Sequence, residues 1–418
     1  MTTLAKRDWK WVAGLFAGNV ILLAVLIGIF RIAVTQAPDY RQPIADWTSE
    51  ALGLPVVIGS MDARFGLDGP RLVFGDMTVL SADGSEALFS LQRGSLSLDV
   101  MELLFRWRFK ARRLTLENLD LEVDRSEDGQ LLVFDRTLDE FPKGEGELPL
   151  QEIRIRDARL ILRDRMSNGQ TWVLKGFDAE LSKRRGELKI EGAFQAPASV
   201  AGPITFWAKS RNGEGWQAYA RVQKLDLSAT QQIAGLPSAV PSGGRGDLRL
   251  WFDMDAGLVT RLSAEAELTD LVFEFDDSEP VVYRGLEGRL EWDRRPTGWR
   301  GRVENLIVRR GGAQWRSASL LVEKSATPLG DEGDYLFDAD FLRLQDLTPL
   351  APAIPDVALR EDLQGLQPRG DVTDLTVGLS VLDKDPTGYR LELRADLNGY
   401  SHEAFESIPG IRGLTGQV

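Results

Sequence analysis

The chain has 418 residues, a formal net charge of −13 at pH 7, 41 glycines, 19 prolines and no cysteine. The acidic balance argues against nucleic acid as a partner, and a chain without cysteine cannot rely on disulfides. The length exceeds what one hydrophobic core normally organises, so we expect several domains or an elongated array of strands.

The first uncharged run, from Trp11 to Phe30, predicts a transmembrane helix. At a rise of about 1.5 Å per residue it reaches roughly 30 Å, the thickness of a bilayer core. The basic excess at Lys6, Arg7 and Lys10 favours a cytoplasmic N-terminus, with the rest of the chain exported to the periplasm. The residues expected to anchor the chain in the membrane are Trp11, Leu15, Ile21, Leu22, Leu26 and Phe30.

A cleaved signal peptide is the alternative, because Thr35 to Ala37 has the small-x-small pattern of a cleavage site. The apolar core of a signal peptide has about 7 to 15 residues, and the run here is longer. We therefore expect an uncleaved anchor.

A short interfacial helix is expected at 34–53, where Ile44, Trp47 and Leu52 have helical spacing. From Leu54 the apolar residues alternate with a period of two, which is typical of strands. A helix at 100–109 interrupts them. The first strands are expected at 55–58, 71–74, 77–80, 87–89 and 94–99.

An internal repeat follows. The segment 114–125 precedes Asp128-Gly-Gln, and the similar segment 153–164 precedes Asn168-Gly-Gln. Asp-Gly and Asn-Gly between apolar runs predict hairpins, because both residues of a type I′ turn need positive φ. Strand, turn and strand therefore recur in the same order.

Within each repeat the apolar alternation slips by one residue, at Asn118 or Asp157. A regular strand would turn its apolar face outward there, so a bulge or bend is required. An alternative is that Asp and Asn merely favour strand ends. The same apolar-x-Asp/Asn-apolar pattern recurs at 74–77, 268–271, 303–306, 344–347 and 372–375, with looser copies at 174–177 and 222–225.

The predicted fold is mainly β: a long, twisted, mostly antiparallel sheet of about twenty strands that forms an elongated groove, with a few short helices. One of these helices follows Pro355. A strand opens at 413–418 with no cap after it, so the chain is expected to be part of a longer protein. The expected divisions are a tail and anchor at 1–33, the interfacial helix at 34–53, groove at 54–235, a linker at 236–246 and groove at 247–418.

A catalytic or metal centre is not expected. His402 is the only histidine, expected in an exposed loop, and a zinc site would need carboxylates almost alone. Segment 241–247 resembles a phosphate-binding loop but lacks Gly-Lys-Ser/Thr, so it is interpreted as linker. The pairs Asp253 with Asp255 and Asp276 with Asp277 are interpreted as solvated turns. We expect no enzyme, cofactor or metal.

A long apolar face with few helices must close on itself or be covered by a ligand. Phospholipid acyl chains are suited to cover this face, since each buried CH₂ contributes about 0.8 kcal/mol without any specific polar contact. The candidate groove residues are Leu119, Leu121, Val123, Leu160, Leu162, Phe273 and Phe275.

Five segments resemble the YhdP branch of the AsmA-like proteins: 52–65, 69–80, 96–104, 114–121 and Pro409 to Gly416. The resemblance implies a protein of a Gram-negative bacterium that is anchored in the inner membrane and exposed to the periplasm. It further implies a taco-shaped β-groove that carries phospholipids towards the outer membrane, and no catalytic residues.

An alternative function is an anchored scaffold that assists outer-membrane protein or envelope assembly. Exposed strand edges would bind its partners by β-augmentation. Envelope proteins at the ends of the groove are further expected partners.

Overall fold

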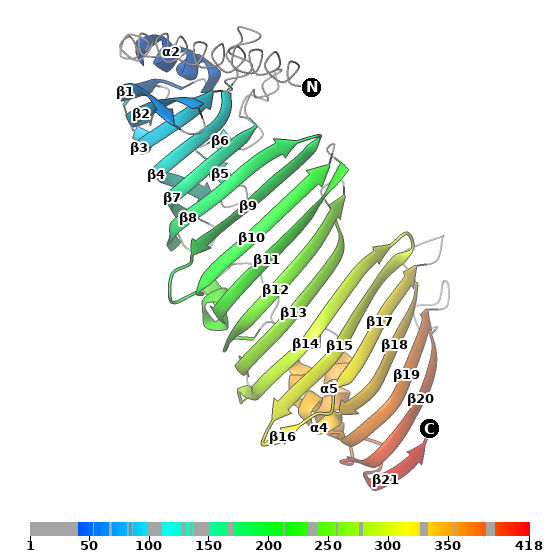
Figure 1. Cartoon of the computed structure of the whole chain (residues 1–418). Coiled ribbons are helices and arrows are strands. Elements are labelled where there is room, and N and C mark those ends of the chain that lie inside the picture. Colours follow the sequence, from blue (N-terminus) through cyan, green and yellow to red (C-terminus); the bar gives the residue numbers. More distant parts are fainter. Residues whose placement is uncertain are drawn as a thin grey trace, which may run out of the picture. The chain divides into compact units, whose positions relative to one another are not determined.

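A computed structural model describes residues 41–418 with internal gaps (Figure 1). The gaps are residues 53, 67–68, 82, 86, 99–110, 127–130, 134–135, 138–150, 166–169, 212–213, 233–240, 256–257, 276–278, 327–332, 355–356 and 382–388. The predicted transmembrane helix therefore lies outside the described residues, as does the helix expected at 100–109. Within the described part, no helix has the length and apolar character needed to cross a membrane.

The chain divides into two compact units, unit 1 (Met1–Arg184) and unit 2 (Arg185–Val418). The described part of unit 1 begins with the helix expected before the strands, α2 (Arg41–Leu52). Its strands are β1 (Val56–Gly66), β2 (Gly69–Leu80), β3 (Ala87–Leu98), β4 (Ala111–Arg125), β5 (Leu131–Val133), β6 (Arg136–Thr137), β7 (Glu152–Asp164) and β8 (Gln170–Arg184).

The strands of unit 1 pair in the order β1, β2, β3, β4, β7, β8. All of these pairs are antiparallel except β4 with β7, which are parallel. The register of that pair sets Leu114 opposite Ile153 and Leu121 opposite Leu160, so the internal repeat lies side by side in the sheet. Each copy is followed by an antiparallel return strand, β5 or β8, as predicted.

Unit 2 is a meander in which each main strand is antiparallel to the next. Its strands are β9 (Glu187–Gln195), β10 (Pro203–Arg211), β11 (Glu214–Asp226), β12 (Gly243–Asp255), β13 (Leu258–Phe273), β14 (Val281–Arg295), β15 (Gly298–Arg310), β16 (Ala313–Gln314), β17 (Ala318–Ala326), β18 (Gly333–Arg343), β19 (Arg369–Val381), β20 (Tyr389–His402) and β21 (Ile411–Gln417).

The helices of unit 2 are short. Between β18 and β19 lie α4 (Leu344–Leu347), η3 (Thr348–Ala353) and α5 (Val357–Leu366), the last being the helix predicted after Pro355. A short 3₁₀ helix, η2 (Leu227–Gln232), precedes the expected linker, and β12 begins within that linker's range at Gly243. The prediction of mainly antiparallel β structure with few short helices is confirmed.

The predicted slips are single residues in the left-handed conformation. A residue in this conformation interrupts the alternation of side chains by one position. The apolar residues that follow it therefore point to the same face as those that precede it. Asp and Asn adopt this conformation more readily than other non-glycine residues. The slip residues, with φ between 49° and 56°, are Asp76, Asn118, Asp157, Gly176, Lys224, Asp270, Asn305 and Asp374.

Polar side chains of the next strand satisfy the backbone at some of these slips. The Asp157 N–H donates to Asp178 Oδ1 over 3.0 Å, and the Lys224 N–H donates to Asp247 Oδ1 over 2.9 Å. A bulge leaves a ladder donor unpaired, and a carboxylate acceptor compensates for it. This explains how a slip is tolerated inside a paired strand.

Two expectations about the slips need correction. The copy at 344–347 is not a strand slip, because the chain leaves the sheet there as α4 and Asp346 is buried as a hydrogen-bond acceptor. In addition, β2 is continuous where strands at 71–74 and 77–80 were expected, since Asp76 joins them without breaking the pairing. The slip also occurs at Gly399 and Gly413, where glycine stands in place of the Asp or Asn of the pattern.

The slip conformation can be tested at Asn305, an exposed residue of β15 with φ of 53°. Asn305→Val should lower the free energy of unfolding by about 2 kcal/mol, because a β-branched residue is strained in the left-handed region. Asn305→Gly removes the same side chain but adopts this φ freely, so its effect should stay within about 0.5 kcal/mol. Urea denaturation of both variants measures the difference. Equal destabilisation would contradict the role assigned to the backbone.

Candidate functional site

Unit 2 has one apolar face, built from residues that lie opposite each other on successive strands. Directly opposed residues share a face of the sheet, so the register determines which side chains gather. One row contains Ala220, Leu250, Ala264, Leu290, Val303, Leu320, Ala339 and Leu375. The next row contains Ala218, Phe252, Leu262, Trp292, Gly301, Val322, Phe337, Val377 and Leu393. We call these rows the apolar face of unit 2.

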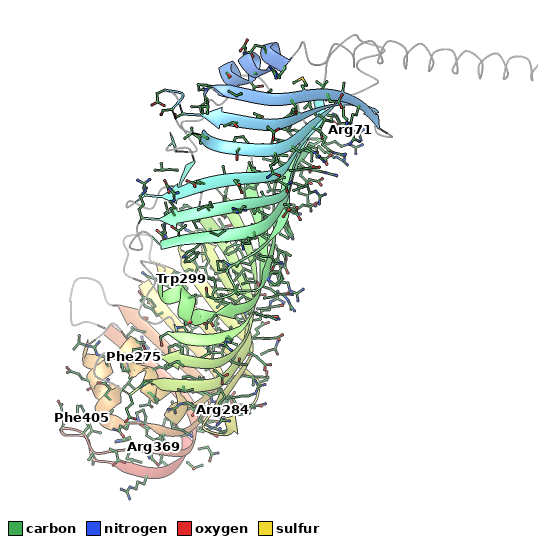
Figure 2. The ribbon with its side chains drawn as sticks, turned by 90° about the vertical axis from the view of Figure 1, so that its left-hand side faces the viewer. Arg71, Phe275, Arg284, Trp299, Arg369 and Phe405 are labelled. Carbon is green, nitrogen blue, oxygen red and sulfur yellow. The ribbon has the colours of Figure 1, made fainter. Side chains whose placement is uncertain are left out.

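The opposite face of unit 2 is charged. Along one of its rows acids and arginines alternate: Asp253, Arg261, Asp293, Arg300 and Glu323. Arg300 Nη2 lies 2.7 Å from Glu323 Oε2, and Arg261 Nη1 lies 3.5 Å from Asp253 Oδ2. Figure 2 shows Phe275 and Trp299 on the side of this sheet where the helices lie, and Arg284 on the other side. The two faces therefore present different chemistry to a ligand.

Unit 1 has the same division between its faces. Its register aligns an apolar row that contains Val56, Val79, Phe89, Leu121, Leu160 and Leu174. On the reverse face, ion pairs join β4 to β7, with Arg163 Nη2 3.0 Å from Glu122 Oε2. The helix α2 covers one end of the apolar side, where Ala45 is buried with residues of β1 and β2.

The candidate groove residues of unit 1 are brought together on its apolar side. Leu119 is 4% exposed and packs with Leu91 and Ala158. Leu121 lies opposite Leu160, and Val123 lies opposite Leu162. That these residues line a groove stays a prediction.

The two candidates of unit 2, Phe273 and Phe275, stack on each other with ring centroids 6.5 Å apart. Both pack against the hydrophobic core of unit 2. Their contact with a ligand also stays a prediction.

A block formed by α4, η3 and α5 covers part of the apolar face of unit 2. Three leucines of this block, Leu344, Leu347 and Leu350, pack on the hydrophobic core of unit 2. That core includes Leu271 and Phe341. Burial of these side chains is what holds the block against the sheet.

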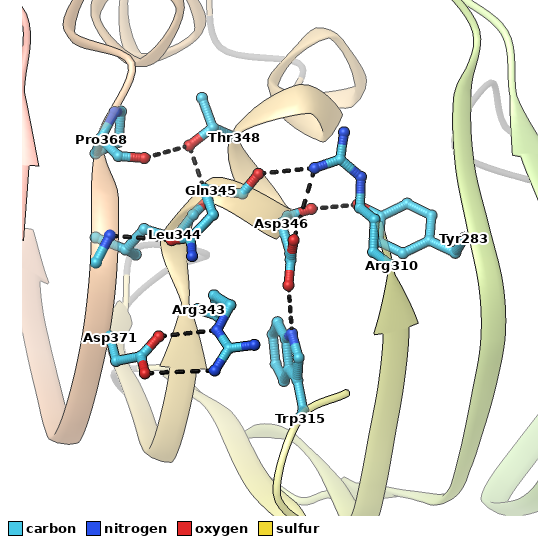
Figure 3. A network of polar contacts seen from close by, with 11 residues as sticks. Tyr283, Arg310, Trp315, Arg343, Leu344, Gln345, Asp346, Thr348, Pro368 and Asp371 are labelled. Atoms are coloured by element: carbon cyan, nitrogen blue, oxygen red, sulfur yellow. Dashed lines mark hydrogen bonds and ion pairs between the residues drawn. The ribbon is translucent and has the colours of Figure 1, made fainter. Parts of the chain in front are cut away.

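Polar contacts fix the position of the block (Figure 3). The Trp315 indole N–H donates to Asp346 Oδ2 over 2.8 Å, and Arg310 Nη1 donates to the Gln345 carbonyl over 2.9 Å. The Tyr283 hydroxyl donates to the Asp346 carbonyl. At the other side, Arg343 Nε donates to Asp371 Oδ1 over 2.9 Å. A buried carboxylate with these partners is costly to move, so the block stays in place.

Away from the block, large apolar side chains of the same face are exposed. Leu391 is 55% exposed, Leu393 is 52% exposed and Leu290 is 38% exposed. Sequence reasoning did not single them out, although β20 alternates clearly, because the face they share depends on the pairing register. Among the described residues, this uncovered region is the surface best suited to an apolar ligand.

The structure corrects the expectation for His402. It is 8% exposed at the end of β20, with Nδ1 2.8 Å from the Glu403 carbonyl oxygen, and so it is not in an exposed loop. The end of α5 lies beside it, because the Glu403 N–H donates to the Leu366 carbonyl. Asp276 and Asp277 lie outside the described residues.

The sequence matches the YhdP protein family model over residues 1–418. The chain belongs to the YhdP family. It is similar to a curated relative, the intermembrane phospholipid transporter YhdP of Escherichia coli (strain K12), with 33% identity over 103 residues. That match covers 25% of this chain and 8% of the relative, so it spans a small part of the relative's length. No solved structure matches the chain.

Because Tyr283 belongs to the network at the helical block, the free energy of unfolding should change with pH in the alkaline range. Burial raises the pKa of Tyr283 to about 12, from 10.0. A raised pKa stabilises the fold below pH 10, and this contribution is lost as the pH rises through 12. Between pH 10 and 12, the free energy of unfolding should therefore fall more in the native chain than in Tyr283→Phe, by about 2 kcal/mol. Urea titrations across this range provide the measurement.

At pH 8 the Tyr283→Phe variant should be the less stable, by about 1 kcal/mol, because the hydrogen bond to Asp346 is lost. Parallel pH dependences in the two proteins would show that burial does not raise the pKa of this tyrosine.

Proposed function

We propose that the apolar face binds phospholipid acyl chains and that the chain acts in phospholipid transport between two membranes. The observation that carries this proposal is the uncovered part of the apolar face of unit 2, where successive strands contribute two adjacent rows without a charged side chain. Ordinary soluble sheets cover such a face with helices or a second sheet. Here the block covers one part of it and leaves Leu290, Leu391 and Leu393 exposed.

The chemistry of this face suits a ligand that must move. Burial of each CH₂ contributes about 0.8 kcal/mol and has no directional requirement. An acyl chain can therefore shift from one row to the next while it exchanges equivalent contacts. The charged reverse face stays hydrated and keeps the sheet soluble.

The relationship to a named transporter supports the same function. The curated relative carries the name intermembrane phospholipid transporter, and the chain matches the family model along its whole length. The uncharged run at 11–30 would anchor the chain in the inner membrane, with both units in the periplasm. In this arrangement the apolar face shields acyl chains from water on the way to the outer membrane.

Charged substitutions on the two faces test the proposal. Leu290→Asp combined with Leu393→Asp should reduce the phospholipid that co-purifies with the chain by at least about fivefold, since a buried carboxylate is strongly disfavoured beside an acyl chain. Both side chains are partly exposed, so the variant should fold. The matched control is Val282→Asp, because Val282 is 49% exposed on the opposite face of β14. Mass spectrometry of extracted lipid gives the readout.

Unchanged lipid content in the folded double variant would overturn the proposal, as would an equal loss in the Val282→Asp control. The scaffold alternative is tested by photo-crosslinking from Leu393 on the apolar face and from positions along β1 and β21. Lipid adducts at Leu393 support transport. Protein adducts at the strand edges without lipid adducts at Leu393 support a scaffold.

A further inference from the structure

A third row lies on the same side of unit 2, next to the two rows of the apolar face, and it carries cations. Arg294 of β14 lies opposite Trp299 of β15, Trp299 lies opposite Lys324 of β17, and Lys324 lies opposite Tyr335 of β18. Cations and aromatic rings thus alternate along four neighbouring strands. The adjacent row on the same face is Trp292, Gly301, Val322 and Phe337, which has no charge.

The acids nearest in sequence point to the other face and are occupied there. Glu323 accepts from Arg300 Nη2 at 2.7 Å and from Arg295 Nη1 at 3.0 Å. Asp293 accepts from Arg295 Nε at 3.2 Å. These contacts neutralise the charged face internally and leave its carboxylates unavailable to the row.

The two cations of the row have no carboxylate partner among the described residues. Lys324 Nζ lies 5.5 Å from the centroid of the Tyr335 ring, a cation–π contact that does not neutralise the charge. Arg294 is exposed. The row is therefore a positive site at the border of an apolar surface.

The spacing suits a single phosphate. Neighbouring strands lie about 4.8 Å apart, so Arg294 and Lys324 are separated by roughly 10 Å at the backbone, with Trp299 between them. Both side chains are long enough to reach one group above the indole ring, which Lys324 would do by turning from the Tyr335 ring toward Trp299. Arginine binds phosphate oxygens through two N–H groups, and lysine adds a compact charge. Trp299 and Tyr335 offer an apolar body with a polar tip, which suits a boundary between water and hydrocarbon.

We propose that this row binds the phosphate of a phospholipid headgroup, between Arg294 and Lys324, while the acyl chains lie on the adjacent apolar row. This inference rests on the proposed function and adds a headgroup site to it. The occupant is a lipid because a free phosphate would make no use of Trp292, Val322 and Phe337. Two cations without a carboxylate partner in the described part of the chain also repel an ammonium group, so the site favours anionic over zwitterionic phospholipids.

Binding of lipids to the full-length chain in detergent tests the site. The probes are fluorescent phosphatidylglycerol, phosphatidylethanolamine and diacylglycerol, the last having no phosphate. Arg294→Gln combined with Lys324→Gln should weaken phosphatidylglycerol binding roughly tenfold or more, since charge-assisted hydrogen bonds are lost. Diacylglycerol binding should not change. The preference for phosphatidylglycerol over phosphatidylethanolamine should disappear in the variant.

A matched control removes two cations from the opposite face. Arg245→Gln combined with Arg261→Gln changes the net charge equally, and these side chains are 80% and 69% exposed. Equal loss of phosphatidylglycerol binding in the control would overturn the headgroup site, because net charge alone would explain the effect. Retained affinity and preference in the Arg294 and Lys324 variant would also overturn it.

Competition with inorganic phosphate separates a lipid site from an anion site. At millimolar concentration inorganic phosphate should leave phosphatidylglycerol bound, and displacement would show a site for free anions instead. Failure of the native chain to bind any of the three lipids would contradict the proposed function itself. Binding of all three with unaltered preference in the variant would contradict the headgroup site alone.

Discussion

The left-handed residue inside the strands is the constraint on which both faces depend. Side chains of a strand alternate with a period of two, but in β13 (16 residues) the apolar positions shift by one between Leu268 and Leu271. A single slip at Asp270 returns Leu271 to the side that already holds Leu268. Without the slip, the apolar side chains on one side of it would point toward the charged face. The slip thus maintains a continuous apolar surface at the cost of one unpaired backbone donor.

Packing of the helical block decides which part of that surface is available. The block is pinned by Asp346, which accepts the Trp315 indole N–H, and by the salt bridge of Arg343 with Asp371. Its leucines pack against residues of strands β13 to β19 and complete a hydrophobic core there. The other strand ends carry no such cover among the described residues, and their exposed leucines form the candidate ligand surface. The fold therefore combines one closed part with one open part on the same face.

Charged side chains are concentrated on one face of the sheet, so the two faces favour different groups: one favours water and the other favours hydrocarbon. On the reverse face arginines and acids alternate and neutralise each other, as in the pair of Arg300 with Glu323. Next to the two rows of the apolar face, a third row carries charge at Arg294 and Lys324. An amphiphile has the same order of groups, with hydrocarbon beside a charged head. The match between the two orders supports the proposal of a lipid as ligand over that of an apolar small molecule.

The sequence alone determined the mainly β fold class and most positions of the slips. Alternation of apolar residues predicts strands, and a shift of that alternation at Asn118 or Asp157 can be satisfied only by a local backbone change, so no tertiary information is needed. The pattern failed at Asp346, since a local motif cannot show whether the chain remains in the sheet or leaves it as a helix. Tertiary structure decided the site. Which residues stand opposite each other, as Trp299 and Lys324 do, depends on the register between strands, and the register depends on the packing of the whole face. For the same reason the burial of His402 and the exposure of Leu391 could not be predicted from their neighbours in sequence.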